Sequence, residues 1–195
     1  MTAGPTTWPG DDESKPAPGP LRTVQALVNT VERPDGADRL ADPDNARPWL
    51  VDSGLLTETA PLTDADRALL VDVREAMRAM LVHNAGGPAP SAGQLAPLHR
   101  LADAARLRTS VGAGGELQVS AAGDELSDRL ATLLVAIRDA QRDGSWTRLK
   151  ACRNDECQWA FYDASRNHAG SWCEMASCGN KLKNRQFRAR RRAQG

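Results

Sequence analysis

The four cysteines of this chain are the residues best suited to chemistry, and all of them lie in its last 44 residues. They form two pairs, Cys152 with Cys157 and Cys173 with Cys178, with four residues inside each pair and fifteen between the pairs. Zinc prefers thiolate sulfur in a tetrahedral arrangement, and a site closed by four protein ligands is structural rather than catalytic. The spacing therefore predicts one structural Zn²⁺ ion, with two disulfides in one of three connectivities as the alternative.

A basic segment follows the cysteines directly. Residues 181–192 carry seven Lys/Arg and no Asp/Glu. On a helix, Lys181, Arg185, Arg188 and Arg192 would fall within about 60° of one another, and phosphates or acidic groups would relieve the repulsion within such a stripe. Beside a zinc module, this pattern favours a nucleic-acid partner over a solvated tail. The candidate nucleic-acid contacts are Arg166, Lys181, Lys183, Arg185, Arg188, Arg190, Arg191 and Arg192.

Charge is distributed unevenly along the 195 residues, although the net charge is zero. Residues 148–195 carry eleven Lys/Arg against four Asp/Glu, and residues 1–147 carry fourteen against twenty-one, which predicts an acidic body and a basic arm. No apolar run approaches the roughly 20 residues that a membrane span needs, so we expect no membrane partner. The polar N-terminus lacks the apolar stretch of a secretory signal, which favours a cytoplasmic protein and therefore metal over disulfides.

The elements that must position the cysteines are mainly helical. Residues 1–20 hold five Pro and three Gly and are interpreted as a disordered leader. Helical spacing of apolar residues predicts helices over about 21–31, 43–53, 64–84, 92–105 and 124–142. The N-terminal signals Asp42-Pro43, Thr63 and Ser91 and the stop at Gly144 mark their ends, although Pro97 fits poorly inside a helix. Residues 107–111 and 116–120 predict one short β-hairpin. The expected domains are a helical one over 21–147, able to fold alone, and a small zinc module over 148–195.

Catalytic arrangements are missing from the sequence. The three histidines, His83, His99 and His168, are isolated, and there is no Ser/His/Asp set, phosphate-binding glycine loop or suggestive carboxylate pair. We therefore expect no enzyme activity. Asn29 and Trp49 are candidate pocket residues, and an asparagine that bonds backbone and a tryptophan in the core explain them equally well.

Aromatic residues are concentrated around the cysteines. A small zinc module needs aromatic side chains for its core, and exposed rings can instead stack on bases. We expect Trp159, Phe161 and Trp172 in the core and leave Tyr162 and Phe187 open. Gly179, directly after the last cysteine, is expected to adopt the positive φ of a tight metal knuckle.

These residues resemble a known family. The segment 152–167 combines two cysteines with aromatic-x-Asp-x-Ser-Arg-Asn, and the segment 172–183 reads Trp-Cys-Glu-Met-Ala-Ser-Cys-Gly-Asn-Lys-x-Lys. Together they resemble the CGNR-type zinc finger, in which four cysteines bind zinc and the module is regarded as a DNA binder. Leu27-Val-Asn-Thr30, Trp49-Leu50 and Gly54-Leu-Leu56 resemble the ABATE domain that precedes this finger in a family regarded as stress-induced transcription regulators. The resemblance implies a helical ABATE-like domain over 21–147 and a zinc finger with a basic C-terminal helix over 148–195.

The chain departs from the family pattern in two places. Lys181 replaces the arginine of the Cys-Gly-Asn-Arg tetrad, which keeps the charge but loses the bidentate geometry of arginine. The stretch 167–171 is also less basic than in relatives. The sequence thus predicts a DNA-binding transcription regulator with one structural zinc. The alternative is a zinc-stabilised protein-interaction module, whose arm would bind an acidic protein or the acidic body of a second copy in a homo-oligomer.

Overall fold

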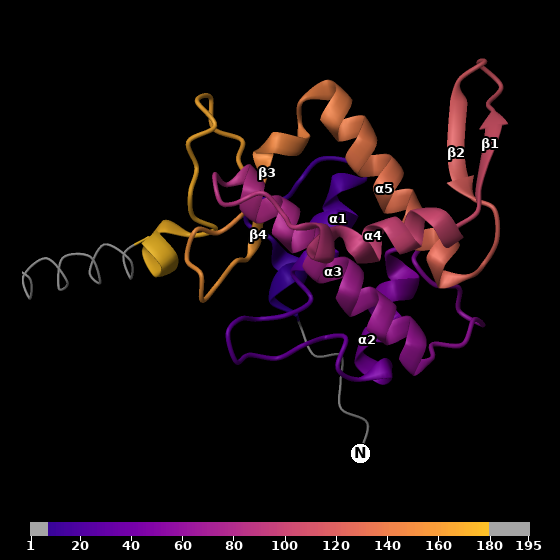
Figure 1. Cartoon of the computed structure of the whole chain (residues 1–195), viewed down its shortest axis with the longest axis horizontal. Helices are drawn as coiled ribbons and strands as arrows, with labels where there is room; N and C mark the ends of the chain where they lie inside the picture. The colour runs from indigo at the N-terminus through magenta and orange to yellow at the C-terminus, as the bar shows by residue number, and fades with distance from the viewer. Residues whose placement is uncertain (1–7, 180–195) are drawn as a thin grey trace, which may run out of the picture.

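The computed structural model of this chain describes residues 8–179, drawn in colour in Figure 1. Within that range the fold is mainly α-helical with two small antiparallel β-hairpins, which confirms the predicted fold class. The basic segment 181–192, predicted to be a helix, lies outside the described residues. The elements are α1 (Leu21–Val28), α2 (Pro43–Asp52), α3 (Asp64–Asn84), α4 (Ala92–Ala104), β1 (Leu107–Val111), β2 (Leu117–Ala121), α5 (Leu126–Asp143), β3 (Leu149–Ala151) and β4 (Ala160–Tyr162).

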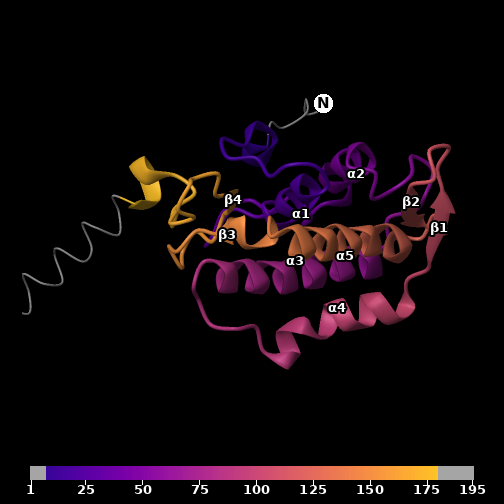
Figure 2. The same cartoon turned by 90° about the horizontal axis from the view of Figure 1, so that it is seen from above.

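The helices of the body are arranged in layers. α1 packs on α3 and α5 from one side, and α4 packs on the same two helices from the other side, as Figure 2 shows. β1 and β2 stand at one end of this stack, while β3, β4 and the cysteine loops lie at the opposite end. The helical body therefore separates a hairpin end from a cysteine end.

Local sequence signals explain where most helices begin and end. The Thr63 hydroxyl accepts a hydrogen bond from the backbone N–H of Asp66, whose carboxylate accepts one from the N–H of Thr63, so the predicted capping box is present. Asp42 caps α2, and Pro43 occupies its first turn. Gly144 ends α5 in the left-handed conformation with φ of 82°.

Two helices differ from their predicted form. α1 ends at Val28 and not near residue 31, because Asn29 caps it and the Thr30 hydroxyl donates to the carbonyl of Leu27. α4 does begin after Ser91 and continues through Pro97. Pro97 lies beyond the first turn, so it removes the bond that an N–H there would make to the carbonyl of Gly93, and the Ser91 capping box offsets part of that cost.

The predicted β1–β2 hairpin is confirmed with its second strand one residue later than expected. Leu107 pairs with Ala121, Thr109 with Val119 and Val111 with Leu117. The tip contains Gly115 with φ of 86°, a conformation that glycine adopts without strain.

The N-terminal segment is ordered from residue 8, and the expectation of a disordered leader is wrong for residues 8–20. The Trp8 ring is buried, and its Nε1 donates to the carbonyl of Asn29 at 2.8 Å. The backbone N–H of Ala17 donates to the side chain of Gln25. These tertiary contacts compensate for the lack of apolar periodicity that suggested disorder. Residues 1–7 lie outside the described part.

One hydrophobic core runs through the helical body and into the cysteine region. Leu149 and Ala160 are fully buried in the same cluster as Leu27, Leu70 and Leu130. β3 packs on α3, and β4 packs on α1. The core is therefore continuous across residue 147, where the sequence suggested a domain boundary. Among residues 8–179, none of the helices has the length and apolar character that crossing a membrane requires.

Candidate metal centre

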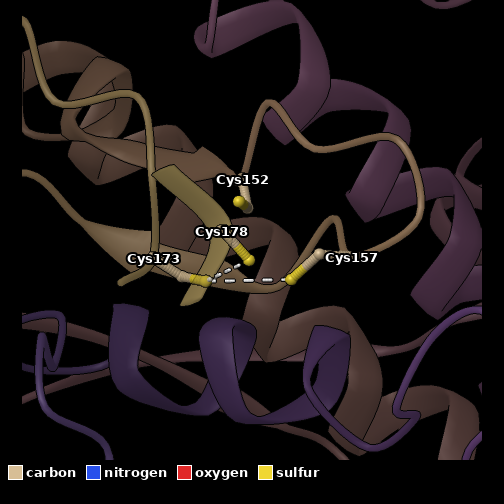
Figure 3. A group of neighbouring side chains, drawn as sticks. All are labelled: Cys152, Cys157, Cys173 and Cys178. Atoms are coloured by element: carbon tan, nitrogen blue, oxygen red, sulfur yellow. Dashed lines mark hydrogen bonds between the residues drawn. The ribbon is translucent and has the colours of Figure 1, made fainter. Parts of the chain in front are cut away.

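The four cysteines come together at one end of the molecule, from two stretches of chain. Cys152 follows β3, Cys157 lies in the turn that leads to β4, and Cys173 and Cys178 belong to the last described loop and its short helical turn, Met175–Gly179. Their sulfur atoms all lie within 4.8 Å of one another and point toward a common centre, as Figure 3 shows. The structure thus assembles all four predicted ligands.

The spacing of the sulfur atoms suits a tetrahedral zinc ion. The sulfurs of Cys157 and Cys173 are 3.7 Å apart, as are those of Cys173 and Cys178. Four thiolates at about 2.3 Å from a zinc would lie about 3.8 Å from each other, whereas the sulfurs of a disulfide are only about 2.05 Å apart. All four cysteines are free, so the arrangement matches one structural zinc and not two disulfides.

Histidine takes no part in this cluster. Among residues 8–179, the group around the predicted site contains only the four cysteines. His168 is exposed in the loop after β4, and its backbone carbonyl accepts a hydrogen bond from Lys150. With four thiolates available, a tetrahedral zinc has no open position for a fifth group.

The chain from Cys152 to Trp159 directs N–H groups toward sulfur. The backbone N–H of Asn154 bonds the sulfur of Cys152, and that of Trp159 bonds the sulfur of Cys157. The Asn154 side chain reaches across to the sulfur of Cys178, with Nδ2 and Sγ 3.9 Å apart. These donors stabilise negative charge on sulfur, as a zinc-thiolate site requires.

Without a cation, two of the thiols hold their protons more tightly than an ordinary cysteine does. The pKa values of Cys157 and Cys173 are raised, first because each donates a hydrogen bond to the sulfur of Cys152, and further by burial. The pKa of Cys152 is lowered because it accepts those bonds. Zinc would replace the shared protons, so its affinity should rise with pH.

The positive-φ residue of the knuckle is not the one expected. Gln158, directly after Cys157, has φ of 49°. Gly179 is not in the left-handed region and serves a different purpose, since a Cβ there would clash with Sδ of Met175 and lie 3.3 Å from the Trp172 ring. Close packing against Met175 and Trp172, and not backbone conformation, therefore favours glycine at residue 179.

Asn29 fastens the cysteine hairpin to α1. Its Oδ1 accepts from the N–H of Ala160 at 2.7 Å, and its Nδ2 donates to the carbonyl of the same residue at 2.9 Å. Asn29 is 1% exposed, so it is a buried structural link and not a pocket residue. Trp49, the other candidate pocket residue, packs in the core, with the Arg39 guanidinium 5.8 Å from its ring.

Within the cysteine region, an ion pair between Lys150 and Asp163 connects β3 to the loop after β4. Sequence reasoning missed this pair. Nζ and Oδ2 are 2.8 Å apart, and the two side chains are 7% and 4% exposed. Asp163 also accepts from Ser165 and from the N–H of Gly170. Burial alone would raise the pKa of Asp163, but these hydrogen bonds outweigh it and hold the pKa below its usual range. The aromatic-x-Asp-x-Ser motif thus organises the loop 163–171.

The loop organised by Asp163 carries Arg166, which is exposed. It is the candidate nucleic-acid contact that the structure describes. The other candidates, Lys181, Lys183, Arg185, Arg188, Arg190, Arg191 and Arg192, lie outside the described residues.

The aromatic residues of the region are divided between core and links. Phe161 is buried, as expected, with Lys15 Nζ 5.0 Å from its ring centre. Trp159 and Trp172 are half-buried, and Trp159 Nε1 donates to the carboxylate of Glu13 at 2.8 Å. Tyr162 is half-buried, and Phe187 lies beyond the described residues.

Comparison with protein families divides the chain into two adjoining matches. The model described as "Putative stress-induced transcription regulator", ABATE, matches residues 21–142, more than half of the chain. The CGNR zinc finger model matches residues 148–191. No curated protein matches the chain.

Proposed function

This chain belongs to the ABATE family and carries a CGNR zinc finger, and on that premise we propose that it is a DNA-binding transcription regulator. The observation that carries the proposal is the charge of the finger region. Residues 181–192 hold seven Lys/Arg and no acid, directly after the zinc ligand Cys178. Such a segment can neutralise backbone phosphates and release their counterions, which is a major source of affinity for nucleic acid.

The zinc has a structural role in this proposal. Cys152, Cys157, Cys173 and Cys178 would fill its coordination sphere, so it would activate no water and carry no reaction. Its contribution is to hold the two cysteine-bearing loops in a fixed relation. Arg166 in the loop 163–171 is the additional phosphate contact, because the bonds from Lys150 and Ser165 to Asp163 fix the base of that loop.

Salt-titrated binding to duplex DNA tests this function. The logarithm of affinity should fall with the logarithm of salt concentration, with a slope of about −0.9 for each neutralised phosphate. Four residues of the basic stripe imply a slope of roughly −3 to −4. Replacing Arg185 and Arg188 with Ala should flatten the slope by about 2, as measured by fluorescence anisotropy of a labelled duplex.

As a matched control, Arg138 and Arg142 are both replaced with Ala. They are two exposed arginines on α5. This double substitution removes the same charge from the body and should leave the slope unchanged. Parallel titrations with single-stranded RNA distinguish DNA from RNA as the preferred partner. Absent binding at low salt, or a slope that ignores Arg185 and Arg188, would favour the protein-interaction function.

A further inference from the structure

The β1–β2 hairpin exposes more apolar surface than a solvated hairpin needs. Leu107, Val111 and Leu117 are 42%, 68% and 74% exposed. Strand alternation and the register place these three, with Thr109 and Val119, on one face. The opposite face is polar, with Arg108, Ser110, Gln118 and Ser120. The hairpin is therefore amphipathic, and its apolar face is largely uncovered by the described part of this chain.

The outer edge of β1 is open for pairing. The N–H of Gly112 bonds the carbonyl of Glu116, and the N–H of Ala122 bonds the carbonyl of Arg106, so even-numbered residues along β1 direct their backbone groups toward β2. The odd-numbered residues Leu107, Thr109 and Val111 consequently direct theirs away. Within residues 8–179 the sheet contains only β1 and β2.

This edge lacks the usual features that prevent strand pairing. β1 contains no proline, and its single charge, Arg108, belongs to a residue whose backbone faces β2. Natural edge strands are commonly protected by prolines, bulges or outward charges. A two-stranded hairpin is also only marginally stable by itself in water, and added strands stabilise it.

We propose that β1 pairs antiparallel with β1 of a second copy of this chain, with Thr109 on the two-fold axis. In this register Leu107 lies opposite Val111 of the second copy, and Thr109 lies opposite its own counterpart. All three facing pairs use backbone groups directed away from β2, and each exchanges two hydrogen bonds. The two hairpins become one four-stranded sheet with a continuous apolar face.

A second copy fits this edge better than an unrelated strand because the register is self-complementary. Apolar Leu107 meets apolar Val111, and Thr opposite Thr is a favourable cross-strand pair. Arg108 falls opposite Ser110, so no like charges meet across the interface. The two-fold arrangement is also the commonest symmetry of soluble oligomers.

The residue on the axis provides a sharp test, by analytical ultracentrifugation of the full zinc-loaded chain over a concentration series. Thr109→Lys places two lysines opposite each other, and Thr109→Glu places two glutamates. Each variant should raise the dimer dissociation constant about tenfold or more. An equimolar mixture of the two should restore the dimer, because lysine then faces glutamate. Gln118→Lys, on the polar face of β2 and away from the edge, is the control and should remain dimeric.

Three outcomes would overturn the proposal. They are a native chain that is monomeric at every concentration, a dimer that Thr109→Lys leaves intact, and single variants that fail to associate when mixed. Circular dichroism of each variant confirms that the helical body is folded. None of these measurements involves nucleic acid, so the result is independent of the proposed function.

Discussion

The two β-hairpins of this protein lie at opposite ends of the helical body and are stabilised in opposite ways. β3 is fully buried and pairs over three residues, whereas β1 is exposed along all five of its residues. β3–β4 is held by Asn29, by the ion pair of Lys150 and by the sulfur cluster that begins at Cys152. β1–β2 has its own ladder and turn, contacts with α5, and the hydrogen bonds of Arg106 to Asp128. Burial, and not strand length, distinguishes the two hairpins.

Of the changes considered, removing the metal should lower stability most, and it acts directly on the end of the molecule that carries β3 and β4. Cys173→Ser takes away one of four ligands, and structural zinc contributes on the order of 10 kcal/mol to the folding of such sites. We expect loss of zinc and a large fall in the melting temperature, measured by elemental analysis and calorimetry. Gln118→Lys, in the exposed β2 and away from the outer edge of β1, should leave both unchanged.

Low pH should weaken zinc binding, as Cys173→Ser does. The raised pKa values of Cys157 and Cys173 mean that metal-free protein keeps protons which zinc must displace. Zinc affinity should therefore fall as the pH falls, as measured with a competing chelator. An affinity that does not change with pH would contradict thiolate ligation.

The next largest difference in stability should come from the ion pairs beside the two hairpins. Lys150→Met leaves the 4% exposed carboxylate of Asp163 without its cation, which costs about 3–5 kcal/mol. Arg106, at the base of β1, is 68% exposed in its pair with Asp128, whose own side chain is 1% exposed. The backbone N–H of residue 106 still bonds that carboxylate after the substitution, so Arg106→Met should cost less, about 1–2 kcal/mol. Chemical denaturation of both variants measures the difference, and equal losses would show that burial does not separate the two pairs.

Matched leucines compare the packing of the two hairpins. Leu149 in β3 is fully buried, and Leu149→Ala should lower the free energy of unfolding by about 3 kcal/mol. Leu117 in β2 is 74% exposed, and Leu117→Ala should change it by no more than about 0.5 kcal/mol. The same denaturation curves test whether the core is shared, because a single transition that shifts with Leu149→Ala requires both regions to unfold together. A separate transition for the cysteine region would support the boundary near residue 147.

The smallest expected effects concern one left-handed residue in each hairpin connection. Gln158 has φ of 49°, where a side chain costs roughly 1 kcal/mol, so Gln158→Gly should stabilise by about 0.5 kcal/mol after the added chain entropy. Gly115 has φ of 86°, and Gly115→Ala should destabilise by about 1 kcal/mol. Thermal melting measures both, and the two changes should have opposite signs.

Local chemistry explains what could be predicted from the sequence. Helix caps and stops depend only on residues that are neighbours in the sequence. Those at Asp42, Thr63 and Gly144 could therefore be predicted without knowing the tertiary structure. The four cysteines could be assigned for a similar reason, because zinc restricts both the type and the spacing of its ligands. The bounds of β1 and β2 follow from β-strand composition and the turn glycines to within one residue.

Long-range contacts explain what was missed. Trp159 bonds Glu13 across 146 residues, and no composition rule connects a Pro-rich N-terminus with a zinc knuckle. Lys150 entered the sequence analysis only as one of the eleven Lys/Arg of residues 148–195, because lysine is rarely buried without a partner and its partner Asp163 becomes apparent only when β3 and β4 pair. Leu149, Lys150 and Ala151 alternate between apolar and polar side chains, a pattern typical of a strand with one exposed face. In the structure both faces of this strand are buried.

The hydrogen bonds between Asn29 and Ala160 constrain how such chains can evolve. One side chain in the ABATE region satisfies both backbone groups of a residue in the finger region. A recombination that joined this finger to a different body would leave that N–H and carbonyl buried without partners, at a cost of about 1–3 kcal/mol each. The finger region therefore cannot be transferred to another domain without loss of stability. We expect the two regions to be inherited together and to change as a pair at their junction.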